Sequence, residues 1–198
     1  MTEVRRADEA DAKAVVETLH RAFFDDPFSC YIFPDPDERE RLHPLLMRSF
    51  VELALATGEI YTLADYACVA VWFPVTGDAD EVAGDGADFV ERTAALCEAN
   101  GERFRTLAAT LEHHHPAHQP HHHLQFLATV PGQQSQGLGR VLLRDRFRQL
   151  DAAGIPAYLE SSSPRSAELY QREGFSRMTA FTLPAGPAAI PMWRPPVR

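Results

Sequence analysis

The spacing of apolar residues along the chain predicts short strands alternating with amphipathic helices. Runs of apolar residues predict strands over 4–6, 60–63, 67–73, 124–130, 155–160, 175–183 and 189–194, the last as an edge strand. Apolar positions three or four residues apart predict helices over 11–24, 37–57, 89–100, 103–112, 138–153 and 167–172. The pattern therefore indicates an α/β (α+β) protein.

Two stretches do not fit either period. Residues 28–33 are aromatic and apolar but lie between prolines, and we expect a loop packed on the core. Residues 76–88 are rich in Gly, Asp and Ala, and we expect a mobile loop there.

Length and charge narrow the classes of protein. The 198 residues are enough for one domain with its own core, and we expect a single domain over 1–198. The formal net charge of −9 makes nucleic acid an unexpected partner and suits a cationic substrate. Three cysteines without metal-ligand or disulfide spacing are expected to be free thiols. With no apolar leader and no run of membrane-spanning length, we expect a soluble, cytoplasmic protein that does not bind membranes.

Chemistry is concentrated where the strand 124–130 meets the helix that follows it. Between them lies Pro131-Gly-Gln-Gln-Ser-Gln-Gly-Leu-Gly139. The first N–H groups of a helix lack internal partners, and the helix dipole adds positive charge there. Glycines allow an anion to approach the backbone, so this loop is a candidate phosphate site. A glycine-containing turn before a helix more often has a purely structural role than a phosphate-binding role. The loop has neither the third glycine of the dinucleotide-binding fingerprint nor the Gly-Lys-Ser/Thr of the P-loop.

The wider context is more specific. Leu127-x-Thr129-x-Pro131, followed by Gln134-x-x-Gly137-x-Gly139, resembles the acetyl-CoA-binding signature of GNAT-type N-acetyltransferases. The segment 158–175, with Glu160-Ser-Ser-Ser-Pro-Arg165 and a Tyr170-x-x-x-Gly174-Phe175 turn, resembles the family's second signature. Its form is most similar to the puromycin N-acetyltransferase branch. The resemblance covers about residues 122–183, which would be the cofactor-binding half.

This resemblance implies a fold, a cofactor and a set of contacts. The expected fold is a mixed, mostly antiparallel central sheet flanked by helices and splayed between the two central strands. Acetyl-CoA (coenzyme A) would be the co-substrate. Its expected contacts are Leu127, Ala128, Thr129, Gln134, Ser135, Gln136, Gly137, Leu138, Gly139, Arg140, Ser163 and Ser166. Ser163 stands where many relatives have Asn, so its contact is less firmly implied.

The resemblance also implies catalytic roles. Tyr170 aligns with the tyrosine that often protonates the leaving thiolate, although a packing tyrosine is the alternative. The base is left open among Glu160, His123 and Asp26, or water. We take Tyr170 and Glu160 as the candidate catalytic residues.

An acceptor pocket is expected near the first helix. Its candidate residues are Asp26, Phe28, Tyr31, Trp72 and His123. Core packing is the more common role for aromatic residues such as Trp72.

Seven of the nine histidines fall within residues 113–123. Imidazole is a common metal ligand, but this spacing matches no defined site, so we expect no metal.

Three functions remain open. The leading hypothesis is an acetyl-CoA-dependent N-acetyltransferase acting on a primary amine of a small molecule, antibiotic-like or metabolic, as a monomer or homodimer. The alternatives are acetylation of proteins or peptides, and a non-catalytic module that binds acyl-CoA or sequesters a drug.

Overall fold

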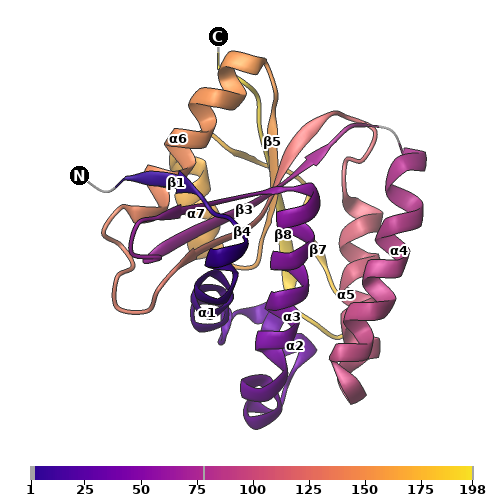
Figure 1. Ribbon diagram of the computed structural model, residues 1–198. Coiled ribbons are helices and arrows are strands. Elements are labelled where there is room, and N and C mark those ends of the chain that lie inside the picture. The colour runs from indigo at the N-terminus through magenta and orange to yellow at the C-terminus, as the bar shows by residue number, and fades with distance from the viewer. Residues whose placement is uncertain (1–2, 78, 198) are drawn as a thin grey trace.

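An eight-stranded mixed sheet runs through the computed structural model, which describes residues 3–77 and 79–197, without the side chains of 79–85 (Figure 1). The strands are β1 (Val4–Arg6), β2 (Glu59–Leu63), β3 (Cys68–Val75), β4 (His121–Thr129), β5 (Ala157–Ser161), β6 (Ser176–Arg177), β7 (Phe181–Thr182) and β8 (Ala188–Arg194). Their order is β1-β2-β3-β4-β5-β8-β6, and β7 also pairs with β8.

The centre of the sheet is its irregular part. All the strand pairs are antiparallel except β4 with β5. These two parallel strands pair only at His122 with Ala157 and at His123 with Tyr158. Beyond that point β4 continues along β3 while β5 continues along β8, so the two central strands part. The expected GNAT-like, mostly antiparallel and splayed sheet is confirmed.

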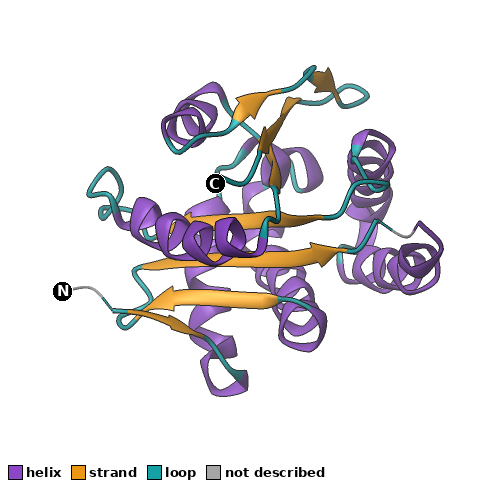
Figure 2. Cartoon of the chain, turned by 90° about the horizontal axis from the view of Figure 1, so that it is seen from above, coloured by secondary structure: helices purple, strands orange, loops and turns teal. Residues whose placement is uncertain are grey.

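Helices cover both faces of the sheet (Figure 2). The α-helices are α1 (Ala12–Phe23), α2 (Pro27–Ile32), α3 (Pro36–Thr57), α4 (Ala79–Leu96), α5 (Gly101–His114), α6 (Leu138–Ala153) and α7 (Pro164–Arg172). Single 3-10 turns, η1 (Glu9–Asp11) and η2 (Glu98–Asn100), precede α1 and α5. α1 and α3 pack on one face of β2–β4, and α6 packs on the other.

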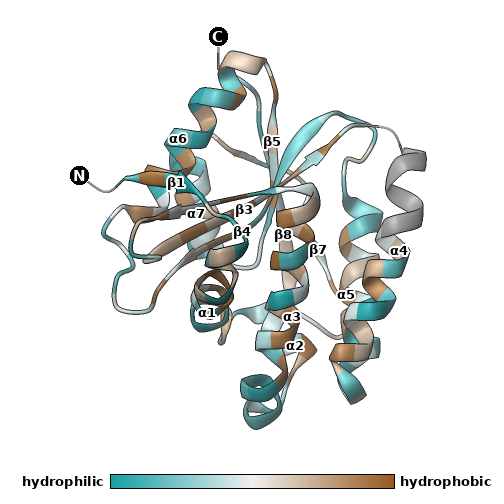
Figure 3. Ribbon diagram, viewed as in Figure 1, coloured by the Kyte–Doolittle hydropathy of each residue, from teal (hydrophilic) through white to brown (hydrophobic). Residues whose placement is uncertain are grey.

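Strand alternation divides the core into two layers. On β3, Val69 and Val71 face α1 and α3, whereas Ala70 and Trp72 face α6. The helices carry brown and teal residues side by side, as amphipathic helices do (Figure 3). None of the helices in the described part of the chain combines the length and the apolarity that crossing a membrane requires. All three cysteines are free, as predicted.

The two stretches predicted as loops are largely helical. Residues 27–32 form α2 because Asp26 caps its first turn, accepting a hydrogen bond from Phe28 N at 2.9 Å, and Pro27 starts it. The predicted mobile loop over 76–88 is wrong for most of its length, because α4 begins at Ala79 instead of near Phe89. The glycines and aspartates of this stretch suggested a loop, but they do not prevent a helix that packs on α5. Position 78 of the predicted loop lies outside the described residues.

Three boundaries also differ from the prediction. Gly101 starts α5 instead of ending the previous helix. The strand expected over 175–183 is two short strands, β6 and β7. The strand at 188–194 is not an edge strand, because β8 lies between β5 and β6. By contrast, Gly154 ends α6 as expected, in a left-handed conformation with φ of 70°.

Candidate functional site

A cleft of about 1160 Å³ opens where β4 and β5 part. One wall is the second half of β4, the loop over 131–137 and the start of α6. The opposite wall is the end of β5, the turn after it and α7, and the end of α1 contributes a third side. The splay of the sheet therefore creates the cleft, and both sequence signatures border it.

The two glycines at the start of α6 have different structural roles. Gly137 caps the helix with φ of 82°, a conformation that most side chains avoid, although a Cβ there would meet no atom within 4 Å. Gly139 lies against the strand instead, because a Cβ would come within 3.3 Å of Leu127 Cδ2. The left-handed turn leaves the free N–H groups of a sixteen-residue helix at the cleft, where an anion is favoured.

Most of the predicted cofactor contacts line the cleft. They are Leu127, Thr129, Gln134, Ser135, Gln136, Gly137, Leu138, Gly139, Arg140, Ser163 and Ser166. Ala128 does not, because alternation along β4 turns its side chain into the core beneath α1 and α3. The Arg140 side chain is paired with the buried Glu173 carboxylate at 2.6 Å. This ion pair holds Arg140 at the cleft mouth.

A short chain of hydroxyl groups fixes the turn after β5. Ser163 caps α7, its Oγ accepting a hydrogen bond from Ser166 N at 3.2 Å. Ser166 Oγ lies 2.7 Å from Ser163 Oγ and 2.8 Å from Ser161 Oγ. The first role of Ser163 is therefore to start α7, which carries Tyr170 into the cleft.

Tyr170 lies at the inner part of the cleft. It is buried to 9% exposure on α7, and its ring packs edge-on against Phe175 at 5.8 Å. Within the described part of the chain its hydroxyl has no hydrogen-bond partner, although the side chain borders the cleft. Burial, with the nearby Asp26 and Cys68, raises the pKa of Tyr170 above its usual range. The phenol is therefore protonated at neutral pH and is a proton donor.

Asp26 reaches the cleft from the turn between α1 and α2. Its Oδ2 accepts a hydrogen bond from Ser162 Oγ at 2.5 Å, which ties this turn to the one after β5. Burial raises the pKa of Asp26 despite the hydrogen bonds from Ser162 and Phe28 N. This carboxyl group is thus partly desolvated beside the tyrosine.

Glu160, on β5, is the deepest carboxylate of the cleft. Its side chain is 5% exposed, with His123 Nε2 at 2.8 Å from Oε2 and His115 Nδ1 at 3.5 Å from Oε1. Burial opposes ionisation, but the histidines outweigh it and lower the pKa of Glu160. The group is therefore a persistent anion and a weak base.

The other predicted pocket residues are not at the cleft. Trp72 is wholly buried against Phe147 of α6, because strand alternation points it into that layer of the core. Phe28 packs on the core beneath α1 and α3, and the Tyr31 hydroxyl donates a hydrogen bond to Pro184 O at 3.2 Å. His123 does not line the cleft, but it contacts Glu160, which does.

Sequence reasoning missed three basic side chains. Arg21, Arg165 and Arg172 also line the cleft. Arg165 stands in the first turn of α7, inside the quoted second signature, so its position was a usable signal. Arg21 lies on the polar face of α1, where nothing in the sequence separates it from a solvated surface residue.

The comparisons with known proteins agree with this geometry. A sequence model of the acetyltransferase (GNAT) family matches residues 40–175. An uncharacterized N-acetyltransferase from Schizosaccharomyces pombe is 22% identical over 197 residues, covering 95% of this chain and 80% of the relative.

Two solved structures share the fold. The histone acetyltransferase HPA2 and related acetyltransferase of Corynebacterium glutamicum has a TM-score of 0.68 and 26% identity, covering 100% of this chain and 98% of the other. Arylalkylamine N-acetyltransferase 2 of Aedes aegypti has a TM-score of 0.71 and 14% identity, covering 98% and 99%. With the family match spanning more than half of its length, the chain belongs to the acetyltransferase (GNAT) family.

Proposed function

We propose that the protein transfers the acetyl group of acetyl-CoA to a primary amine of a small molecule. The observation that carries this proposal is that one cleft holds a phosphate-type loop and helix start, the buried phenol of Tyr170, and the carboxylates of Asp26 and Glu160. Members of this family use acetyl-CoA as the co-substrate, and the donor groups at the mouth fit its anionic end.

The mouth of the cleft suits the pyrophosphate and the ribose phosphate of coenzyme A. The free N–H groups at the start of α6 offer hydrogen-bond donors, and Gly137 has no Cβ that would keep a phosphate away from them. Arg165 and Arg172 stand on the opposite wall, from α7. Positive charge on both sides of the mouth favours a ligand with several phosphate charges.

The inner end suits a protonated amine. Asp26 and Glu160 both line the cleft, and Glu160 remains ionised because two histidines hold its pKa low. An ammonium group is attracted by these carboxylates and must lose a proton before it reacts. We assign Glu160 as the first acceptor of that proton, and because its pKa is low it releases the proton at once to solvent.

The transfer then needs one further proton. The amine lone pair attacks the thioester carbonyl, the C–S bond breaks, the new amide nitrogen releases its second proton to solvent, and the sulfur leaves as a thiolate. Tyr170, which is protonated and whose hydroxyl makes no hydrogen bond to the described residues, donates its proton to that sulfur. The phenolate recovers a proton from water after the product leaves.

Two classes of acceptor are candidates, a small amine and a peptide. The mosquito neighbour is named for arylalkylamines, and the second signature resembles the puromycin N-acetyltransferase branch. The hydrogen bond from Ser162 to Asp26 ties the turn after α1 to the turn after β5, and we take this fixed wall of the cleft as favouring a small amine over a protein chain. The Corynebacterium neighbour is named as a histone acetyltransferase, so a peptide acceptor is the second candidate.

A panel of amines assayed with acetyl-CoA tests the proposal. The panel contains arylalkylamines, polyamines, aminonucleosides and lysine peptides, and free thiol is the readout. We expect thiol release with at least one small amine at a higher kcat/KM than with any peptide. Binding of acetyl-CoA without thiol release on any amine would indicate the non-catalytic module instead.

A further inference from the structure

The role given to Glu160 in the transfer does not explain why three imidazoles of the histidine-rich segment gather around it. His115 follows α5, and His121 and His123 stand on β4. The ring centroids of His115 and His123 are 4.9 Å apart, and those of His115 and His121 are 5.0 Å apart. One ligand atom each from His115, His123 and Glu160 lies within 4.8 Å of the others.

The hydrogen bonds fix where the protons are. Gln119 O can only accept, so His121 Nδ1, at 2.6 Å, is a donor. With its proton on Nδ1, the neutral imidazole of His121 carries a lone pair on its other nitrogen, Nε2. His115 Nε2 lies 3.1 Å from that nitrogen and must donate to it.

This leaves His115 Nδ1 with a lone pair when the ring is neutral. That atom faces Glu160 Oε1 at 3.5 Å, and the carboxylate oxygen also carries lone pairs. Two such atoms repel each other unless a cation lies between them. The position therefore calls for a proton or a metal ion.

Two polar atoms at the cluster lack a hydrogen-bond partner among the described residues. Glu160 Oε1 and Tyr158 Oη are buried and make no hydrogen bond in the described part of the chain. Tyr158 is wholly buried, and its ring centroid lies 4.8 Å from that of His115 and 5.5 Å from that of His123. Buried polar atoms without partners are rare and point to a missing ion or water.

We propose that His115 Nδ1, His123 Nε2 and Glu160 form a binding site for one zinc-type divalent cation. Two imidazoles and one carboxylate are a zinc donor set, and bonds of about 2.0–2.2 Å put tetrahedral ligands about 3.3 Å apart. The distances of 2.8 Å from His123 Nε2 to Glu160 Oε2 and 3.5 Å from His115 Nδ1 to Glu160 Oε1 bracket that spacing. His121 then orients His115 by accepting its second N–H, as outer partners of metal-binding histidines do.

Titration of the metal alone tests the site. Untagged protein, stripped with a chelator, is titrated with zinc chloride by calorimetry at pH 7.5. We expect one ion per chain and a rise in the melting temperature. His115→Ala should weaken zinc binding at least about 100-fold, since loss of an outer partner alone costs 10–100-fold. His118→Ala, an exposed histidine of the same segment, is the matched control and should bind as the wild type does.

A second probe reports on the ligands themselves. Cobalt(II) in a four-coordinate nitrogen and oxygen site gives stronger visible bands than the six-coordinate hydrated ion, and His123→Asn should remove them. Circular dichroism establishes that each variant is folded. Absence of zinc binding in the wild type would assign the position to a proton on His115 and overturn the metal site. Equal losses in His115→Ala and His118→Ala would place the ion on the surface and overturn it too.

The metal site also predicts an effect on catalytic activity, and this prediction rests on the proposed function. A bound ion occupies Glu160, so zinc should inhibit the wild type reversibly and spare His115→Ala at the same concentration. Zinc bound by calorimetry without inhibition would keep the metal site and overturn the proton role of Glu160.

Discussion

The two ends of the cleft are built in opposite ways. One side of the mouth is a contiguous segment, residues 131–140, most of it exposed, and it presents backbone groups whose direction is set by the left-handed turn at Gly137. The inner end collects buried side chains from distant positions, namely 26, 160 and 170, with histidines from the loop after α5 and from β4.

This difference predicts different consequences of substitution. Under the proposed function, groups at the mouth contact a part of the cofactor that does not react, so they stabilise the bound state and the transition state alike. Groups at the inner end would act on the proton and the leaving sulfur, so their loss should change turnover more than affinity. The predictions that follow test this division, beginning with the largest effect.

Gly137→Asp should abolish tight cofactor binding. A carboxylate about 4 Å from a phosphate costs about 4 kcal/mol at a protein surface and about 1 kcal/mol in bulk water. Because this loop is exposed, we expect the acetyl-CoA Kd to rise about 100-fold, measured by calorimetry. Gly137→Asn is the control, since it imposes a similar strain at φ of 82° without the charge and should lose much less. Equal losses in both variants would attribute the effect to the backbone alone.

Tyr170→Phe should lower kcat about 100-fold and leave the acetyl-CoA Kd unchanged. The ring keeps its packing against Phe175, and only the proton donor is lost. Steady-state kinetics and the melting temperature are the measurements, and a loss confined to kcat marks an interaction made in the transition state. Wild-type turnover in this variant would leave the thiolate to be protonated by water and make Tyr170 a packing residue.

The same contrast explains what the sequence could predict. The strands β4 and β5, the turn at Gly137 and the end of α6 at Gly154 follow from local patterns, because glycine and strand periodicity act over a few residues. The fold class and the family were also predicted correctly.

The inner end could not be derived in the same way. The histidine segment showed no recognisable ligand spacing, because His115 and His123 meet only through the path of the loop that connects α5 to β4. Trp72 was placed in the pocket, yet its face of the sheet depends on the register of β3, which no local pattern fixes. α2 was missed since its start depends on one cap at Asp26.

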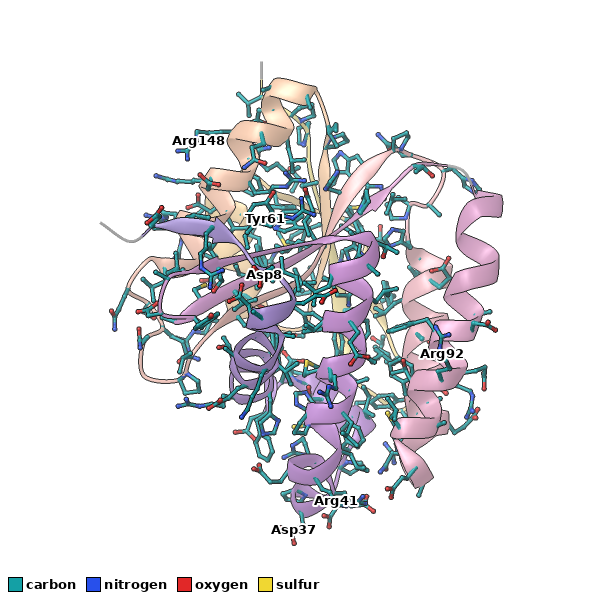
Figure 4. The ribbon with its side chains drawn as sticks, in the orientation of Figure 1. Asp8, Asp37, Arg41, Tyr61, Arg92 and Arg148 are labelled. Atoms are coloured by element: carbon teal, nitrogen blue, oxygen red, sulfur yellow. The ribbon has the colours of Figure 1, made fainter. Side chains whose placement is uncertain are left out.

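Arg165→Ala should raise the KM for acetyl-CoA a few-fold, with kcat unchanged. The side chain is exposed at the mouth, so its attraction for phosphate is weakened by solvent and by salt. The loss should therefore shrink as sodium chloride is raised from 50 to about 500 mM. Arg148→Ala is the control, because Arg148 projects from α6 at the edge of the molecule (Figure 4) and does not line the cleft. An equal effect in both variants would mean that net charge, and not this arginine, steers the cofactor.

Asp26→Asn should have the smallest effect, a gain in stability that depends on pH. Burial raises the pKa of Asp26 in the folded protein above its value in the unfolded chain. The folded state therefore holds more protons than the unfolded state between those two values, and wild-type stability falls as the pH rises through that window. Asparagine has no charge to bury, and it can still accept the hydrogen bond from Phe28 N.

The melting temperature of Asp26→Asn, relative to the wild type, should thus be higher at pH 7 than at pH 3.5. We expect a difference of about 2–4 °C, which corresponds to about 1 kcal/mol in a chain of this size. Asp25→Asn removes one negative charge next to it from a side chain that is 86% exposed, and it corrects for the change in net charge. A relative melting temperature that falls with rising pH would show that the hydrogen bonds from Ser162 and Phe28 N outweigh burial. Asp26 would then be an ordinary helix cap, and the division between an exposed mouth and a desolvated inner end would have to exclude it.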